Sequence, residues 1–246
     1  MTRPTPPWVY RAVVAVLRPP MCVITRPRRW RGAEHLPDGP FIAVANHISV
    51  LDPFTTLHFL VDHGVYPSVL AKASLWRVPV VRWVVRRAGA VPVHRESAQA
   101  SGALVEAEAA LAAGYAVLVF PEGTTTQDPH DWPMAAKSGA ARLALRTGAT
   151  VVPVAQWGAQ RVIPNRGHVA FRPFPAKPSD VVAGPPVDLD DLLNRADDPA
   201  AWAIATSRMM TRITGQLAEI RGEDPPAEPF VRQPRLPVLR RRRWKA

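Results

Sequence analysis

Short apolar runs that alternate with helix-like segments are the feature of this sequence that most restricts its fold. Five runs of five to eight residues are predicted as strands: 41–45, 68–73, 90–94, 115–120 and 150–157. Segments with helix start or stop signals follow them in turn: 53–64, 78–89, 98–114, 137–148 and about 199–220. Strands separated by helices pair in parallel through crossover connections. The sequence therefore predicts an α/β fold with a mostly parallel central sheet flanked by helices.

Two segments of the C-terminal half refine this prediction. Pro153 lies inside the run 150–157, and because proline has no N–H to donate, it favours a bulge or an edge strand there. The alternation of residues 168–174 indicates a further strand.

The positive charge of the chain is concentrated at its two ends. The 246 residues carry a formal net charge of +11. Residues 1–32 contain seven Arg and no acid, and residues 231–246 contain six Arg and one Lys, again without an acid. Removing these 14 charges leaves 11 − 14 = −3 for the middle of the chain. Such ends favour a polyanionic partner, either nucleic acid or an anionic membrane surface, although a solvated tail is an alternative for the C-terminus.

The N-terminal run "WVYRAVVAVL", residues 8–17, combines aromatic, aliphatic and basic residues. It is shorter than the roughly 18 apolar residues that a membrane span needs, and Arg11 interrupts it. Its composition suits a segment lying in the bilayer interface, and a helix docked on the protein's own core is an equal alternative. We expect three parts: a basic amphipathic lead, the main domain and a Pro/Arg-rich basic tail, at residues 1–32, 33–222 and 223–246.

The stretch "NHISVLD" places a histidine and an aspartate directly after the first predicted strand. His47 and Asp52 would point about 140° apart on one continuous helix. The pair Asp52-Pro53, however, reads as the N-cap and first residue of the next helix, so His47 lies in a loop that can fold back toward it. A carboxylate on one ring nitrogen orients the other as a general base for an alcohol. The alternative, a capping Asp52 and an ordinary loop histidine, stays open at this point.

The stretch "LVFPEGTTTQD" delivers a second polar group to the end of a predicted strand. Parallel sheets collect their ligand sites beyond the carboxyl ends of their strands. Gly123 permits close backbone approach there, and successive amide hydrogens can form an anion-binding nest. Glu122 can accept a hydrogen bond from a polyol hydroxyl, and an ordinary strand-to-loop turn is the alternative.

Basic residues near the predicted strand ends suit a phosphate group. Arg95 follows the run 90–94, and its planar fork binds oxyanions through two hydrogen bonds. Lys72, Lys137 and Arg142 can assist, although each also reads as a solvated surface charge. The single cysteine, Cys22, excludes an intrachain disulfide and a cysteine-rich metal site, and we expect no metal and no bound cofactor.

These stretches together resemble the glycerolipid acyltransferases, in particular the bacterial lysophosphatidic acid acyltransferase family. "NHISVLD" resembles its N-H-x-x-x-x-D signature, and the blocks "GAVPVHRE", "VFPEGTTT" and "VVPVAQWG" resemble three further blocks of that family in the same order. The resemblance covers about residues 36–158, and "AKASLWRVP" and "KSGAARLA" add to it. It implies a glycerolipid-acyltransferase-like fold.

The resemblance also implies an activity and roles for individual residues. The expected reaction moves a fatty acyl group from acyl-CoA or acyl carrier protein, as co-substrate, to the free hydroxyl of lysophosphatidic acid, giving phosphatidic acid. His47 would be the base and Asp52 would orient it. The expected contacts to the glycerol phosphate come from Arg95, Glu122, Gly123, Thr124, Lys72 and Lys137. Many members have arginine where this chain has Thr125, so one phosphate contact is missing.

Several alternatives stay open from the sequence. The acceptor could be another lysolipid or glycerol 3-phosphate, a thioesterase would use the same base, and a non-catalytic basic adaptor would use only the charged ends. We expect the partners to be a lysophospholipid, an acyl thioester and an anionic membrane surface rather than nucleic acid. The expected location is the cytoplasmic face of the cell membrane, with peripheral or interfacial attachment.

Overall fold

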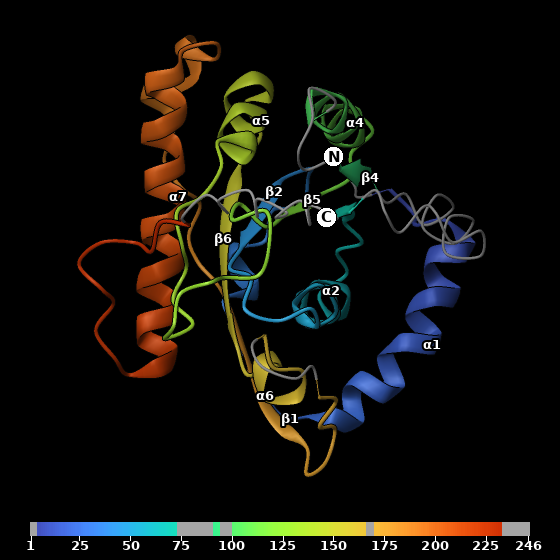
Figure 1. Cartoon of the computed structure of the whole chain (residues 1–246). Helices are drawn as coiled ribbons and strands as arrows, with labels where there is room; N and C mark the ends of the chain where they lie inside the picture. Colours follow the sequence, from blue (N-terminus) through green and yellow to red (C-terminus); the bar gives the residue numbers. More distant parts are fainter. Residues whose placement is uncertain (1–3, 73–90, 94–99, 166–169, 233–246) are drawn as a thin grey trace, which may run out of the picture.

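A computed structural model describes residues 4–72, 91–93, 100–165 and 170–232 (Figure 1). Its seven strands are β1 (Thr25–Arg31), β2 (Ile42–Ala45), β3 (Ser68–Lys72), β4 (Val91–Val93), β5 (Val117–Val119), β6 (Val151–Trp157) and β7 (Lys177–Ala183). Its α-helices are α1 (Trp8–Ile24), α2 (Asp52–Asp62), α4 (Ala100–Ala112), α5 (Gly139–Thr147), α6 (Ala159–Val162) and α7 (Pro199–Arg221), with 3₁₀ turns η1 (Ala33–His35) and η3 (Asp190–Arg195).

The strands form one sheet in the order β1-β7-β6-β2-β5-β3-β4. Every neighbouring pair is parallel except β6 and β7, which run antiparallel. The predicted α/β class with a mostly parallel sheet is therefore confirmed. Strands β2, β5 and β6 lie side by side in the middle, so the loops that follow them meet at one edge of the sheet.

Helices cover both faces of the sheet, as Figure 1 shows. Alternate residues of β2 divide between two cores because successive strand side chains point to opposite faces. Ile42 and Val44 pack in the core with α4, α5 and α7, whereas Ala43 and Ala45 pack in the core that contains Phe59 of α2. Because both faces of β2 are buried, its sequence is continuously apolar rather than alternating.

The C-terminal part of the sheet differs from the prediction. Pro153 is not on an edge strand, because β6 lies between β2 and β7. Pro153 is aligned with Val44 of β2. The aligned residue pairs between β6 and β7 begin at Val154, so the missing N–H of Pro153 removes no hydrogen bond from those pairs. Residues 170–174 form no strand; the additional strand is β7, a few residues later.

The sheet also contains residues that come before position 33, where we expected the main domain to start, because β1 occupies residues 25–31 at its edge. The sequence of this strand, "TRPRRWR", lacks an apolar run, and most of its side chains are exposed. An edge strand can form from such residues because its backbone supplies the pairing. Pro27 lies where the register to β7 shifts, a position that tolerates a missing donor.

Helix α1 shows features of both alternatives for residues 8–17, a helix docked on the protein's core and a segment lying in the bilayer interface. Its buried residues dock it on the domain, and the Tyr10 hydroxyl donates to the Pro67 carbonyl at 3.2 Å. Trp8, Val16 and Val23 nevertheless stay exposed. Among the residues that the structure describes, none of the helices is both long and apolar enough to cross a bilayer.

Candidate active site

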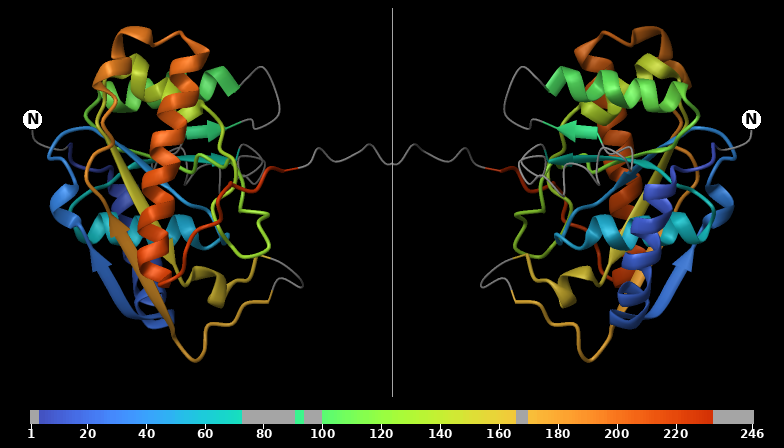
Figure 2. Two further views of the ribbon diagram at one scale, coloured as in Figure 1. Left: turned by 90° about the vertical axis from the view of Figure 1, so that its left-hand side faces the viewer. Right: turned by 90° about the vertical axis from the view of Figure 1, so that its right-hand side faces the viewer.

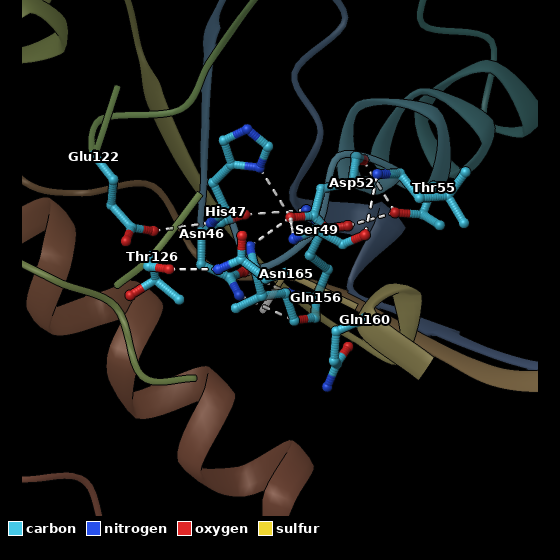
Figure 3. Close-up of polar contacts among 12 residues, drawn as sticks. Asn46, His47, Ser49, Asp52, Thr55, Glu122, Thr126, Gln156, Gln160 and Asn165 are labelled. Atoms are coloured by element: carbon cyan, nitrogen blue, oxygen red, sulfur yellow. Dashed lines mark hydrogen bonds and ion pairs between the residues drawn. The ribbon is translucent and has the colours of Figure 1, made fainter. Parts of the chain in front are cut away.

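His47 and Asp52 contact each other at the carboxyl end of β2. The His47 Nδ1 atom lies 2.9 Å from Asp52 Oδ2, and the other ring nitrogen points away from the carboxylate (Figure 3). The imidazole also packs on the Phe120 ring, with centroids 4.6 Å apart. The loop therefore folds back as the five-residue spacing requires, and it holds the ring in one orientation.

The Asp52 carboxylate does not cap α2, which is a correction to the predicted N-cap. Leu51 is the N-cap residue, and Asp52 is the first residue of the helix. Its Oδ2 atom instead accepts the backbone N–H groups of Ile48 at 2.5 Å and Ser49 at 2.7 Å, in addition to the His47 ring. Complete burial raises the pKa of Asp52, while the bonds from His47 and the two N–H groups lower it.

A buried amide network holds the backbone on either side of the dyad. Asn46 Oδ1 accepts from the Gln156 backbone N–H at 2.8 Å, and its Nδ2 donates to the Gln156 carbonyl at 3.0 Å. The Gln156 side chain donates back to the Asn46 carbonyl at 3.0 Å and accepts from the Thr55 hydroxyl at 2.5 Å. This network joins β2, β6 and α2 directly beside the dyad (Figure 3), and the sequence analysis did not identify its members.

Glu122 connects the His47 loop to a second loop. The residue is only 2% exposed, and its two oxygens accept the backbone N–H groups of His47 at 2.8 Å and Met134 at 3.1 Å. Burial raises the pKa of Glu122 to about 8, although these two bonds oppose the shift. In this structure Glu122 therefore acts first as a bridge between two loops.

The raised pKa of Glu122 predicts that the protein loses stability as the pH rises. The folded state retains the Glu122 proton up to about pH 8, whereas an unfolded glutamate loses it near its ordinary pKa of 4.5. Between these values the folded state binds more protons, so this group lowers the free energy of unfolding by at most about 1.4 kcal/mol per pH unit. We expect Glu122→Gln, which cannot ionise, to flatten the slope. Urea unfolding of both proteins at several pH values from 5 to 8 measures it, and equal slopes would contradict the prediction.

The far side of the Glu122 loop is held by the end of α7. The Arg221 guanidinium lies over the rings of Trp132 and Trp157, 4.0 Å and 4.4 Å from their centroids. It also donates to the His130 carbonyl at 2.8 Å. Stacking between two aromatic faces is a favourable use of arginine and fixes the loop that leads to Met134.

The predicted binding residues near Glu122 lie on the surface of the same loop. Gly123 has a φ of 72°, which favours glycine, and the Lys137 side chain lies beside it, about 3.4 Å from where a Cβ would be. The Gly123 N–H donates to the Phe120 carbonyl at 2.9 Å, so it is not oriented as a member of an open nest. Thr124 is half-buried in the following turn.

Two predicted cationic residues cannot be placed in the site. Lys72 ends β3, at the edge where the other strand ends gather, but its side chain is not described. Arg95 lies outside the described residues. Arg142, the third assisting cation considered, stacks on Trp202 of α7 at 4.7 Å from the ring centroid instead. Within the described residues, no group of three metal-ligating side chains comes together.

Comparison with known proteins identifies the family of this domain. A sequence model of the acyltransferase family matches residues 28–157, more than half of the 246 residues. The chain belongs to the acyltransferase family. The matched range contains His47, Asp52 and Glu122, and it ends at Trp157, the last residue of β6.

Relatives and a solved structure support this assignment. The acyltransferase chain is 32% identical over 138 residues to a chloroplastic 1-acyl-sn-glycerol-3-phosphate acyltransferase of Brassica napus, covering 55% of this chain and 38% of that protein. It is 34% identical over 125 residues to the 1-acyl-sn-glycerol-3-phosphate acyltransferase of Borreliella burgdorferi, covering 50% and 48%. The chain thus spans less than half the length of these relatives.

The fold of this acyltransferase also matches a crystal structure. That structure is the 1-acyl-sn-glycerophosphate acyltransferase PlsC of Thermotoga maritima, with a TM-score of 0.66. The alignment covers 88% of this chain and 83% of that one, and the sequence identity is 24%. At this identity the likeness shows the shared fold.

Proposed function

We propose that this acyltransferase transfers a fatty acyl group from a thioester to the free hydroxyl of lysophosphatidic acid. The observation that carries the proposal is the buried His47–Asp52 pair, in which the other ring nitrogen of His47 is turned away from the acid at the carboxyl edge of the sheet. The names of the relatives, 1-acyl-sn-glycerol-3-phosphate acyltransferases, support the choice of acceptor.

The chemistry follows from the geometry of the pair. His47 Nε2 takes the proton of the acceptor hydroxyl while the oxygen attacks the thioester carbonyl. Asp52 accepts the Nδ1–H and stabilises the imidazolium that forms. The tetrahedral intermediate then expels the thiol of coenzyme A or acyl carrier protein, which receives the proton from His47. No nucleophile of the enzyme is required.

The decisive experiment offers the purified protein a panel of acceptors with one acyl-CoA. The panel contains lysophosphatidic acid, glycerol 3-phosphate, other lysophospholipids and no acceptor, and mass spectrometry resolves the products. We expect phosphatidic acid as the main product. Free fatty acid without any lipid product would identify a thioesterase, and no consumption of acyl-CoA would favour a non-catalytic adaptor.

Lys137 is proposed to supply a cation toward the acceptor phosphate, together with Arg95 and Lys72. Its side chain lies beside Gly123, two residues before Thr125, the position where many members have arginine. A hydrogen bond to a charged group is worth about 1.5–3 kcal/mol. We therefore expect Lys137→Met to raise the KM for lysophosphatidic acid about tenfold or more, with a smaller effect on an acceptor without phosphate. Arg212→Met, an exposed cation on α7, is the control, and equal KM values would exclude this role.

We further propose attachment to the cytoplasmic surface of the membrane through the basic lead and tail. The support comes from the exposed Trp8 and Val16 of α1 and from the arginine residues of the first 32 positions. Near an anionic leaflet each basic residue contributes roughly 1 kcal/mol. The lead, the domain and the tail remain our proposed division of the chain, although β1 of the lead pairs into the sheet.

A further inference from the structure

A short loop before β7 exposes two large aromatic side chains. Phe171 is 64% exposed and Phe174 is 70% exposed, and Arg172 and Pro173 separate them. Most large apolar residues of the described chain are buried, so two exposed phenylalanines three positions apart are a feature that folding alone does not explain.

This loop lies beside the C-terminal end of α1. The first residue of β1, Thr25, is aligned with Lys177, the first residue of β7, so the chain just before each strand is close in space. On the α1 side this places Val23, 45% exposed, near the loop that carries Phe174. Figures 1 and 2 show the end of α1 and this loop at the same end of the molecule in every view.

The charged residues around this apolar end are mainly cations. Residues 8–33 contain six Arg and no acid, and residues 170–179 contain Arg172 and Lys177 and no acid. Two acids from neighbouring elements contact these arginines. Asp62 pairs with Arg18 at 2.7 Å, and Asp180 lies 3.8 Å from Arg29. The remaining arginines of β1 are exposed, so the surface combines shallow apolar contacts with an excess of cations.

Residues 163–165, which precede this loop in the sequence, contact the catalytic loops. The Ile163 carbonyl accepts the Ser49 hydroxyl at 2.7 Å, and Asn165 donates to the Thr126 carbonyl. Ser49 and Thr126 each lie within four residues of the dyad or of Glu122 in the sequence. The Arg172 N–H donates to the Val162 carbonyl at 2.8 Å, so the loop with the two exposed phenylalanines lies next to a segment that borders the site.

From these observations we infer that the Phe171–Phe174 loop is a second membrane contact, which enters the headgroup region of an anionic bilayer together with the end of α1. Phenylalanine beside arginine is the composition of an interfacial anchor, and the cations select anionic lipid. The inference deepens the proposed function, since an acceptor that resides in a bilayer must reach His47 from this surface. An acidic protein partner would also meet the cations, but it would not bury the two rings when lipid vesicles alone are added.

The test uses the full chain and a fluorophore that responds to polarity. Because Cys22 is the only cysteine, Cys22→Ser gives a background without thiols, and Phe174→Cys then carries a single nitrobenzoxadiazole label. We expect its emission to increase and shift to the blue with vesicles of phosphatidylcholine containing phosphatidylglycerol, and to change little with phosphatidylcholine alone. The matched control is Leu193→Cys on η3, which is 41% exposed and where no shift is expected. The η3 turn comes just before α7 in the sequence, and Figure 1 shows the start of α7 at the opposite end of the molecule.

Vesicle sedimentation of unlabelled variants supplies a second measurement. Phe171→Ser with Phe174→Ser should weaken binding to the anionic vesicles at least about tenfold, because two apolar side chains no longer leave water. The control pair is Val105→Ser on α4 with Leu193→Ser; both residues are exposed, at 61% and 41%, and neither belongs to the loop or to α1, so this variant should bind like the wild type. An unchanged label at position 174, or wild-type sedimentation of the double phenylalanine variant, would overturn the inference. Neither measurement requires turnover, so a failure here is distinguishable from a failure of the proposed activity.

Discussion

His47→Ala is expected to lower turnover by about 10²–10⁴-fold, the usual contribution of a positioned general base. The physical reason is specific to this site. Asp52 binds one nitrogen of the ring and Phe120 packs on its face, so the other nitrogen, Nε2, has a fixed orientation. Alanine leaves the acceptor hydroxyl without a base, while the fold loses little because the Asp52 carboxylate keeps its two backbone donors.

The measurement is acyl-CoA-dependent conversion of lysophosphatidic acid by purified protein, with urea unfolding as the check on the fold. His35→Ala is the matched control, because that histidine lies in η1 and its ring is 4.0 Å from the Glu34 carboxylate rather than bonded to Asp52. We expect the control to keep its rate. If His47→Ala turned over substrate at the wild-type rate, His47 would have no part in the chemistry.

The parts of the fold that the sequence predicts are those with a strong local signal. Strands β2, β5 and β6 are continuous apolar runs because both faces of the sheet are covered, and helix α7 starts at Asp198-Pro199 and ends before Gly222. Strands β1 and β7 could not be predicted in this way. Their pairing depends on backbone bonds to a neighbour distant in sequence, and their side chains carry charges and prolines that indicate loops.

The site shows a similar division. His47 and Asp52 were identified because a reactive pair follows a strand, and their contact depends on one short loop. The amide network of Asn46, Gln156 and Thr55 was missed because most of its bonds go to backbone groups and join segments remote in the sequence. The sequence contains a weak indication of Gln156, because an amide residue stands near the end of an otherwise apolar strand run, and the structure buries it. The Arg221 contact with Trp132 joins residues 89 positions apart, for which a single sequence offers no pattern.

Asp52→Asn is the second substitution with a large expected effect, and the hydrogen bonds explain why it tests charge alone. Oδ2 accepts all three donors, whereas Oδ1 is buried and has no hydrogen-bond partner within the described part of the chain. The asparagine carbonyl can take the place of Oδ2 and keep these bonds, with the amide group at the position of Oδ1. What is lost is the negative charge that stabilises the imidazolium during the reaction.

We therefore expect Asp52→Asn to lose about 10²–10⁴-fold in turnover while its free energy of unfolding stays close to that of the wild type. Asp52→Ala should lose activity and stability together, because the N–H groups of Ile48 and Ser49 would be left buried without an acceptor, at about 1–3 kcal/mol each. Steady-state rates and urea unfolding of the two variants separate these effects. Wild-type turnover of the asparagine variant would show that the carboxylate only shapes the loop, since geometry would then suffice without charge.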